Sequence, residues 1–343
     1  VWGHDETTRV GDSSFDNARG ILNSQGAIAG QDANGNIKII GLEAFGGRSG
    51  VAYSSGTSGA YESFYRLVNG SNKVKTYCST KYGFGFIRND GTVVIESNQR
   101  YSDWYGSALT DSDGGQWRES GGLLESYRAA DSTYVSVANR IRNAVKIFGS
   151  SGNESYDRSA FAILTEYGQL YTVGHGDLGG WSEDVSNLLV NVSDVYVNAG
   201  SMAALKTDGT VVCWSQNTSE YGQSTTDLTD IVNIHHNNYS RSYVAENSSG
   251  TLIPFGDVSY GGAPYQINSD DTLEQDHTSL LVGFSPSLVV GNKGAWAAIK
   301  SDGTVVCWGH RDYGGNYSDV STTLSTINAV TIQATDSAFA VLN

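Results

Sequence analysis

Short apolar runs separated by polar, glycine-containing turns are the main pattern along the chain. The runs span roughly 4–8 residues and are rich in Val, Ile, Tyr and Phe, which is typical of β-strands. Segments 203–214 and 297–308 show the pattern most clearly and are identical at ten of twelve positions. Each has an Ala-Ala-aliphatic-Lys run, an Asp-Gly pair and a Thr-Val-Val-Cys-Trp run. Because Gly accepts the positive φ of a tight turn, each segment predicts an antiparallel hairpin.

The hairpin signature occurs in six internal copies, four of them weaker than these two. Their turn glycines are Gly35, Gly91, Gly168, Gly209, Gly250 and Gly303. An aromatic or aliphatic residue followed by a second glycine comes 11 to 15 residues later in every copy; these glycines are Gly46, Gly106, Gly179, Gly222, Gly261 and Gly314. The nearly constant offset indicates a repeated structural module.

A seventh copy is divided between the two ends of the sequence. Residues 337–343 match the strand before a turn, and Val1-Trp2-Gly3-His4 matches 306–310, the strand after one. Joining these ends would complete a hairpin and leave no open sheet edge, which is what a ring of small sheets requires. The sequence therefore predicts a ring closed by a blade that both termini share.

The repeat can be written as hydrophobic-Ala-Leu-x-x-Asp-Gly-x-Val-x-x-Trp-Gly, followed by Tyr or Leu and Gly-Gly or Gly-Gln. It resembles the repeat of the regulator-of-chromosome-condensation (RCC1-like) seven-bladed β-propeller family, and Tyr221-Gly222-Gln223 is the best match to that family's Gly-Gln segment. The resemblance covers essentially the whole chain. It implies an all-β fold: one propeller domain over 1–343, with seven four-stranded antiparallel blades around a central channel.

Unequal repeat spacing predicts two insertions. The turn glycines are 56, 77, 41, 41 and 53 residues apart, so the surplus falls within 97–145 and 263–285. Apolar residues in 123–143 fall near helical spacing and favour a short helix. Insertions in propellers often lie on a binding face, although packing on their own blade is the alternative. The first insertion supplies the candidate partner contacts, Trp104, Tyr105, Trp117 and Tyr127. The second reads as a solvated acidic loop.

Charge and hydropathy exclude several classes of partner. With 21 Lys and Arg against 36 Asp and Glu, the formal net charge is −15, which opposes nucleic-acid binding. No run of 18 apolar residues occurs, so no membrane span is expected. The partners expected are therefore other protein chains, of the same or a different kind, bound through propeller faces and insertion loops.

Catalytic and metal-binding patterns are missing from the sequence. Asp111-Ser-Asp113 alternates carboxylates as a calcium loop does, but lacks the rest of that pattern and reads as a turn. His4, His175 and His310 recur at one position of the repeat, which favours a structural role. The three cysteines have no zinc spacing and read as small buried side chains. Without a nucleophile elbow or nucleotide-binding glycines, we expect no enzyme activity, cofactor or metal.

Seven Asn-x-Ser sequons suggest an extracellular N-glycoprotein, with unmodified loop asparagines as the alternative. They begin at Asn69, Asn153, Asn191, Asn217, Asn238, Asn247 and Asn316. The chain lacks an initiator Met and a signal peptide, which favours a mature form or one trimmed by the experimenter.

These features predict a non-enzymatic protein-binding or structural scaffold propeller, extracellular or surface-exposed, which could be a subunit of a filament or particle. The alternative, implied by the family's best-known role, is a cytoplasmic guanine-nucleotide exchange factor or regulator of a small GTPase. The acidic charge and the lack of a basic tail oppose the chromatin-binding part of that role.

Overall fold

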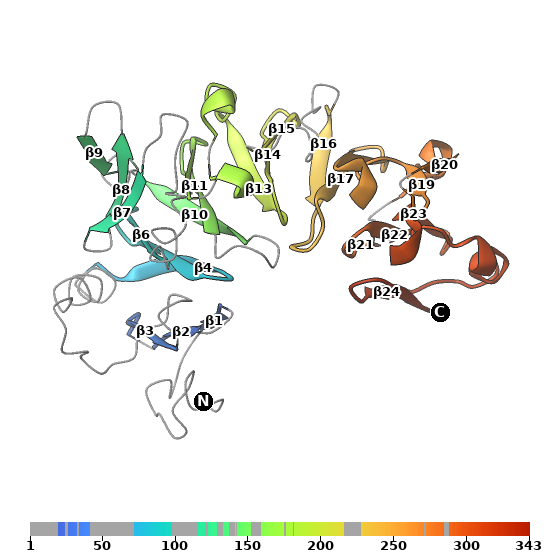
Figure 1. Ribbon diagram of the computed structural model, residues 1–343, viewed down its shortest axis with the longest axis horizontal. Coiled ribbons are helices and arrows are strands. Elements are labelled where there is room, and N and C mark those ends of the chain that lie inside the picture. Colours follow the sequence, from blue (N-terminus) through green and yellow to red (C-terminus); the bar gives the residue numbers. More distant parts are fainter. Residues whose placement is uncertain are drawn as a thin grey trace, which may run out of the picture. The chain divides into compact units, whose positions relative to one another are not determined.

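Small, mainly antiparallel sheets make up most of the described part of the protein (Figure 1). The computed structural model describes residues 20–24, 27–32, 34–41, 72–97, 116–120, 123–128, 133–136, 141, 143–151, 159–174, 176–180, 182–215, 228–270, 272–284 and 288–343. The chain divides into two compact units, Val1–Val190 and Asn191–Asn343, and each is described by itself. The predicted all-β class is confirmed. None of the helices in the described part combines the length and hydropathy that a membrane crossing requires.

The first unit contains four three-stranded sheets within its described residues, each with its strands in chain order. The first is β1 (Gly20–Asn23), β2 (Ala27–Gln31) and β3 (Ile37–Gly41), and the second is β4 (Val74–Thr80), β5 (Gly83–Arg88) and β6 (Val93–Ser97). The third is β7 (Gln116–Ser120), β8 (Leu123–Arg128) and β9 (Thr133–Ser136), and the fourth is β10 (Ala144–Ser151), β11 (Ser159–Thr165) and β12 (Leu170–Gly174). Two short 3-10 helices follow, η4 (Gly176–Leu178) and η5 (Glu183–Val185).

The second unit repeats the same plan. Two three-stranded sheets are β13 (Val192–Val197), β14 (Met202–Lys206), β15 (Val211–Trp214), and β16 (Ile231–His235), β17 (Ser242–Asn247), β18 (Leu252–Gly256). A five-stranded sheet has the order β20-β19-β23-β22-β21, and a two-stranded sheet pairs β24 (Thr331–Ala334) with β25 (Phe339–Leu342). Its strands are β19 (Tyr265–Ile267), β20 (Leu273–Asp276), β21 (Leu288–Gly291), β22 (Ala295–Ile299) and β23 (Val305–His310). The short helices are η6 (Val258–Tyr260), η7 (Thr278–Leu280), η8 (Arg311–Tyr313), η9 (Ser318–Val320) and α4 (Ser321–Leu324).

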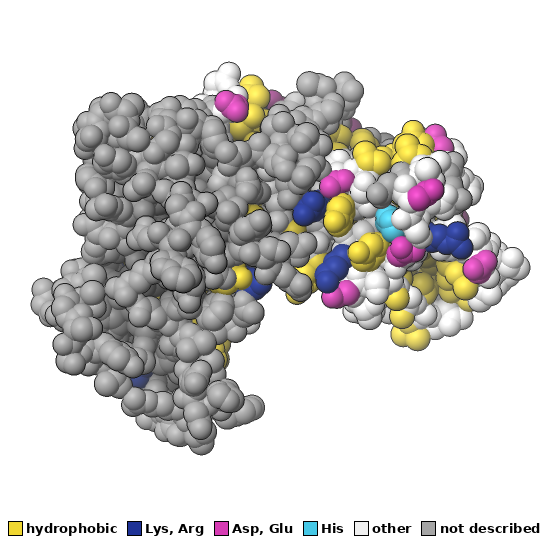
Figure 2. All heavy atoms as spheres, in the orientation of Figure 1, with side chains coloured by type: hydrophobic (Ala, Val, Ile, Leu, Met, Phe, Trp, Pro, Cys, Tyr) yellow, Lys and Arg dark blue, Asp and Glu magenta, His cyan; other side chains and the backbone are white. Residues whose placement is uncertain are grey.

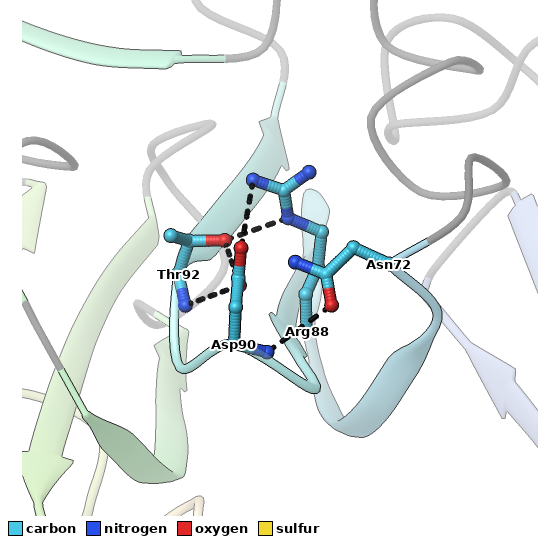
Figure 3. Close-up of polar contacts among 4 residues, drawn as sticks. All are labelled: Asn72, Arg88, Asp90 and Thr92. Atoms are coloured by element: carbon cyan, nitrogen blue, oxygen red, sulfur yellow. Dashed lines mark hydrogen bonds and ion pairs between the residues drawn. The ribbon is translucent and has the colours of Figure 1, made fainter.

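The predicted hairpin turns are confirmed by their backbone conformation. All six turn glycines have φ between 73° and 82°, the left-handed region that a Cβ disfavours. In the turn of Figure 3, Asp90 Oδ1 accepts hydrogen bonds from the Thr92 amide at 3.0 Å and from Thr92 Oγ1 at 2.6 Å. Arg88 Nε donates to Thr92 Oγ1 at 2.7 Å, and Asn72 Oδ1 accepts from the Asp90 amide at 3.1 Å. The Asp-Gly-Thr signature thus encodes a side-chain-braced turn.

Four of the six turn glycines also join their sheet to the next sheet through their carbonyl groups. The carbonyl of Gly91 accepts a hydrogen bond from the Ala144 amide at 3.1 Å. The same bond joins Gly209 to Ile231, Gly250 to Phe284 and Gly303 to Ala329 at 2.9, 2.9 and 3.1 Å. A Cβ on Gly91 would lie 2.7 Å from the Asn143 Cα, so the approach of the next sheet is a second reason for glycine there.

Hydrophobic clusters lie between successive sheets. In the first unit one cluster joins β1–β3 to β4–β6, and another joins β4–β6 to β10–β12. In the second unit three clusters link β13–β15, β16–β18, β21–β23 and β24–β25 in that order. The core is therefore a series of layers, each shared by two neighbouring sheets, as in repeat proteins.

The first predicted insertion contains a sheet, and the helix predicted within 123–143 is wrong for its described residues. Residues 123–128 and 133–136 are strands β8 and β9, because pairing with β7 satisfies their backbone groups and overrides the local helical spacing. The sheets before and after this segment still pack directly on each other through Phe161, Ile147 and Ile87. The described strands β7–β9 thus form a sheet of their own, while β4–β6 packs directly on β10–β12.

The second predicted insertion, 263–285, is a strand pair and not simply a loop. β19 pairs in parallel with β23, with Gln266 opposite Gly309 and Ile267 opposite His310. Its acidic turn lies at the surface, where Asp270 Oδ1 accepts from the Thr272 amide at 3.2 Å. Beyond β20, Leu281 and Phe284 are buried in the cluster between β16–β18 and β21–β23. The burial of Leu281 and Phe284 explains why the segment is ordered, although its acidic residues predict a solvated loop.

The last sheet is shorter than the others. β25 pairs with β24 in full register, from Ala334 opposite Phe339 to Thr331 opposite Leu342. The predicted third strand, Val1–His4, lies outside the described residues. The sheets that repeat along the described chain have three strands, so seven blades of four strands are not confirmed.

Candidate functional site

The predicted partner contacts lie in or near the inserted sheet. Trp104 and Tyr105 fall outside the described residues. Trp117 is in β7, opposite Ser126, and Tyr127 is in β8, opposite Gln116 and Tyr134. The register therefore brings Trp117 and Tyr127 onto adjacent strands of one small sheet, and their role in partner binding stays a prediction.

A second candidate surface lies at one end of sheet β16–β18, and we call it the Tyr239 surface. It consists of Tyr239 and Val258, which are 60% and 43% exposed, together with Arg241 and Tyr260. The turn after β16 and the helix after β18 meet here, because the Asp257 amide donates to the Arg241 carbonyl at 3.1 Å. The Arg241 guanidinium lies 5.1 Å from the centre of the Tyr260 ring. Figure 2 shows exposed hydrophobic side chains interspersed with charged ones of both signs on one face of the described part.

Buried serines hold the Tyr239 surface against the next sheet. Ser242 Oγ donates to the Tyr260 carbonyl at 2.6 Å and accepts from Trp296 Nε1 of β22 at 2.8 Å. Ser240 Oγ lies 2.9 Å from Ser242 Oγ, and both serines are fully buried. Because these buried serine hydroxyls have their hydrogen-bond partners within the protein, they hold the backbone beneath the exposed residues in one conformation.

Asparagines that the sequence reasoning missed cap the turns at this end of the sheets. Asn198 Oδ1 accepts from the Ser201 amide at 2.8 Å, and Asn237 Oδ1 accepts from the Ser240 amide at 2.7 Å. Asn292 Oδ1 likewise accepts from the Ala295 amide at 2.9 Å. Asn237 Nδ2 donates to the Asn292 carbonyl at 3.2 Å and so joins two sheets. The available signal was an asparagine three residues before Ser201, Ser240 and Ala295 in successive repeats.

His310 has the structural role expected of it. His310 Nδ1 accepts from the Asp312 amide at 3.2 Å and caps η8, as Asp257 caps η6. His4 and His175, which share this repeat position, lie outside the described residues. The adjacent His235 and His236 do not form a joint site. His235 Nε2 pairs with Glu246 Oε2 at 3.0 Å, whereas His236 Nδ1 bonds to the Val197 carbonyl at 2.7 Å.

His277 is buried in the second unit, which the sequence did not indicate. It is 1% exposed, and its Nδ1 lies 2.9 Å from the Cys307 carbonyl. The Tyr317 ring packs on it edge to face, with the centroids 5.9 Å apart. Burial lowers the pKa of His277 below its ordinary value, which favours the neutral ring. Burial lowers the pKa of His235 and of His236 in the same way.

The three thiols are shielded from solvent to different degrees. Cys213 and Cys307 are buried as expected, whereas Cys78 is half-buried. Burial raises the pKa of all three thiols to about 12, so none is a nucleophilic thiolate at neutral pH. Within the described ranges, no three His, Cys, Asp or Glu residues are grouped to hold a metal ion. Asp111 and Asp113 lie outside those ranges.

Four of the seven sequon asparagines are described. Asn191 and Asn238 are exposed, and Asn191 has a φ of 58°. Asn247 and Asn316 are half-buried, and their Oδ1 atoms brace turns by accepting from the Thr251 and Ser318 amides at 2.9 and 3.0 Å. Asn69, Asn153 and Asn217 lie outside the described residues. Glycosylation of any of them stays a prediction.

Comparisons with known proteins show similarity to solved propellers only. A scan of protein-family models and a search of curated proteins both give no match. The chain is similar to Prp20p of Saccharomyces cerevisiae, with 14% identity over 84% of this chain and 71% of that chain, at a TM-score of 0.42. It is similar to yeast RCC1 (Prp20) bound to Kap60, with 15% identity over 94% and 78%, at 0.44. It is also similar to human WBSCR16, with 14% identity over 84% and 76%, at 0.42. Similarities this low do not show what this chain binds.

Proposed function

We propose that the protein is a non-enzymatic propeller that binds or assembles with other protein chains. The observation that carries the proposal is the Tyr239 surface: two exposed apolar side chains, Tyr239 and Val258, stand beside the Arg241–Tyr260 pair on a buried, satisfied support. Tyr and Arg are the residue types enriched where protein interfaces bind most tightly. A rigid support lowers the entropy that such an interface loses on binding.

A double variant tests this proposal. In Tyr239→Ser/Val258→Ser, both exposed side chains become small and polar, while the buried serines beneath keep their partners. We expect the variant to fold as the wild type does and to lose binding to the chains that accompany the natural protein, measured by reconstitution and light scattering. The matched control is Val330→Ser, which alters a 70% exposed valine outside the Tyr239 surface. Undiminished assembly of the double variant would overturn the proposed site.

The proposed molecule is a closed ring of seven four-stranded blades, the last shared by the two termini. The match between Val1–His4 and 306–310 supports this, because β23 pairs with β22 as Val1–His4 would pair with β25. Cys307 lies opposite Ala297 in that pair, so Val1 is expected opposite Ala340. A Val1→Cys/Ala340→Cys variant should form a disulfide on mild oxidation, and Val1→Cys/Val330→Cys should not. Equal yields from both variants would contradict the closure.

The proposed location is extracellular or on the surface of a cell or particle, on the strength of the seven sequons and the acidic charge. Intact mass of material from the natural source tests this directly. Glycan masses that disappear when Asn191 is replaced by Gln are expected, since this asparagine is exposed. A bare polypeptide mass would favour the cytoplasmic alternative.

The competing function is nucleotide exchange on a small GTPase. It is tested by the release of a fluorescent guanine nucleotide from candidate GTPases in the presence of the protein. The scaffold proposal expects no acceleration over the spontaneous rate. An acceleration that depends on protein concentration would replace it with the exchange-factor function.

A further inference from the structure

An amine, a carboxamide and a carboxylate meet at the interface between sheets β1–β3 and β4–β6. Lys73, directly before β4, donates a hydrogen bond from Nζ to Asn36 Oδ1. Asn36 Nδ2 donates to Asp32 Oδ2 at 2.8 Å. All three side chains are half-buried. The lysine nitrogen therefore lies at the carbonyl of Asn36, and the carboxylate lies at the nitrogen of the same amide.

The backbone on both sides of this triad is fixed. Asp32 Oδ1 accepts from the Asn34 and Asn36 amides at 2.8 and 2.9 Å, so the turn holds both acidic oxygens in place. Gln31 Nε2 bridges the two sheets by donating to the Val74 carbonyl at 3.0 Å. A Cβ built on Gly35 would lie 3.4 Å from Lys73 Cβ, so the glycine lets the lysine stem pass close to the turn. Such fixed proximity replaces a bimolecular encounter with an intramolecular one.

Other repeats do not carry this combination of residues. The residue after the turn glycine is Thr92, Thr210, Thr251 and Thr304 in four repeats and Gln169 in a fifth. The residue that occupies the place of Lys73 before the first strand is Asn143, Asn191 and Asp230 in later sheets; each accepts the same backbone bond at its carbonyl. The interface between β1–β3 and β4–β6 thus differs from the others at two facing positions, where Asn36 replaces the usual threonine and Lys73 replaces an asparagine or aspartate.

We propose that Lys73 and Asn36 join in an intramolecular isopeptide bond that cross-links sheet β1–β3 to sheet β4–β6, with Asp32 as the catalytic residue. Nζ first releases one proton to solvent, and its lone pair attacks Cγ of Asn36 to form the Nζ–Cγ bond. Asp32, which accepts a hydrogen bond from Nδ2, passes a second proton from Nζ to Nδ2; the Cγ–Nδ2 bond breaks and Nδ2 leaves as ammonia, which takes up the proton released to solvent. Overall, a lysine ammonium and a carboxamide give a secondary amide and an ammonium ion. No oxidant, reductant or co-substrate is needed.

A carboxyl group with a lowered pKa is too weak a base to deprotonate a lysine ammonium, so Asp32 acts only at Nδ2, from which it accepts a hydrogen bond. Hydrogen bonds from the Asn36 side chain and backbone hold the pKa of Asp32 below its ordinary value, so the group is a carboxylate at neutral pH. The same bonds aim Oδ2 at Nδ2, the atom that must be protonated to leave. Half-burial leaves a path by which ammonia can escape, which makes the step irreversible in dilute solution.

The test is the intact mass of the purified full chain, made in a host without N-glycosylation and incubated at neutral pH. The cross-linked protein is lighter than its sequence mass by one ammonia, about 17 Da, and gives one branched tryptic peptide joining Asn36 to Lys73. Lys73→Arg and Asn36→Thr, the latter installing the residue of the other turns, should have their full sequence masses. Lys75→Arg, which replaces an exposed lysine two residues away, should keep the loss.

Several results would overturn the proposal. A wild-type chain of full sequence mass after prolonged incubation, with trypsin cutting after Lys73, shows a hydrogen bond only. A loss of ammonia that persists in Lys73→Arg places the reaction elsewhere. Asp32→Asn should form the bond at least tenfold more slowly, and an unchanged rate would remove Asp32 from the chemistry. Circular dichroism of each variant confirms that it is folded, and Asn36→Thr remains informative if Lys73→Arg is not.

Discussion

The turn glycine Gly250 lies directly against the backbone of Phe284, which begins the next sheet's layer. Its carbonyl accepts the Phe284 amide at 2.9 Å, and a Cβ on Gly250 would collide with the Phe284 carbonyl. Gly283, the neighbour of Phe284, has nearly the same φ, 81° against 74°, but no atom within 4 Å of its Cβ position. Substituting alanine at these two glycines therefore distinguishes the free-energy cost of a left-handed backbone from the cost of steric overlap with the next sheet.

Gly283→Ala and Gly250→Ala form a matched pair of substitutions. We expect Gly283→Ala to lower the free energy of unfolding by about 1–2 kcal/mol, the cost of a left-handed alanine. Gly250→Ala adds overpacking against backbone, and we expect a total loss of about 3–5 kcal/mol. Urea unfolding followed by tryptophan fluorescence measures both. Equal effects would mean that the neighbouring sheet can move away from the turn.

The bond between Trp296 and Ser242 should carry measurable coupling between two sheets. Trp296→Phe leaves the buried Ser242 hydroxyl without its donor, and Ser242→Ala leaves the indole N–H without its acceptor. Each change should cost about 2 kcal/mol, because a buried polar group is left unpaired. The double variant should recover about 1 kcal/mol of the summed loss. Additive losses in this double-mutant cycle would show that the bond between Trp296 and Ser242 does not couple the two sheets.

Stability should fall on mild acidification because of His277. Its folded-state pKa lies below the ordinary value of about 6.5, so the unfolded chain binds the proton more readily. The stabilisation is complete above that value and is lost as the pH falls from it toward the folded-state pKa. Asp276 opposes this shift, and Tyr317 is the other titratable group in contact. His277→Gln should therefore reduce the pH slope of the unfolding midpoint between pH 7 and pH 5.

A control distinguishes this effect from acid titration of the turns. Hydrogen bonds from Thr210 and Thr304 lower the pKa of Asp208 and Asp302 below the ordinary carboxyl value. Their contribution is present above that value and disappears below about pH 4. Asp302→Asn should alter only this lower window. A slope between pH 7 and pH 5 that persists in His277→Gln would then belong to His235 and His236, whose pKa values burial also lowers.

The inserted segment should be removable without loss of the array. The cluster between β4–β6 and β10–β12 includes Phe161, Ile147 and Ile141, which belong to or directly precede those two sheets. Replacing residues 98–140 by a short Gly-Ser linker should change the free energy of unfolding by less than about 1 kcal/mol. If Trp104, Tyr105, Trp117 and Tyr127 bind a partner, the same deletion should abolish that binding. Retained binding would remove these four residues from the predicted interface.

The repeating turns were predictable because their signal is local. Gly209 and Gly303 need a positive φ, and Asp208 and Asp302 brace the residue two places on, so a few adjacent letters encode each turn. The inserted sheet was not predictable in this way. The apolar residues from Leu123 to Tyr134 fit both a helical and a strand period. Only pairing with residues 116–120, which lie outside this run, favours strands.

The candidate surface depended even more on tertiary contacts. No local sequence pattern predicts that Trp296 donates a hydrogen bond to Ser242, or that His277 bonds to the carbonyl of Cys307, 30 residues further along the chain. The capping asparagines recur at one position of the repeat, but the residues that donate to them differ: Ser201, Ser240 and Ala295. In these repeats the accepting asparagine and its position stay the same, whereas the residue whose amide donates the hydrogen bond varies.

The sharing of each hydrophobic layer by two neighbouring sheets also bears on how such a sequence can change over time. A substitution on one sheet has to be matched only by the sheet that faces it, so compensating changes can remain local. Two repeats can then stay nearly identical while others diverge, as 203–214 and 297–308 have done beside the worn copy around Gly168. Divergence confined to one pair of facing sheets is also how a lysine and an asparagine could come to face each other at Lys73 and Asn36.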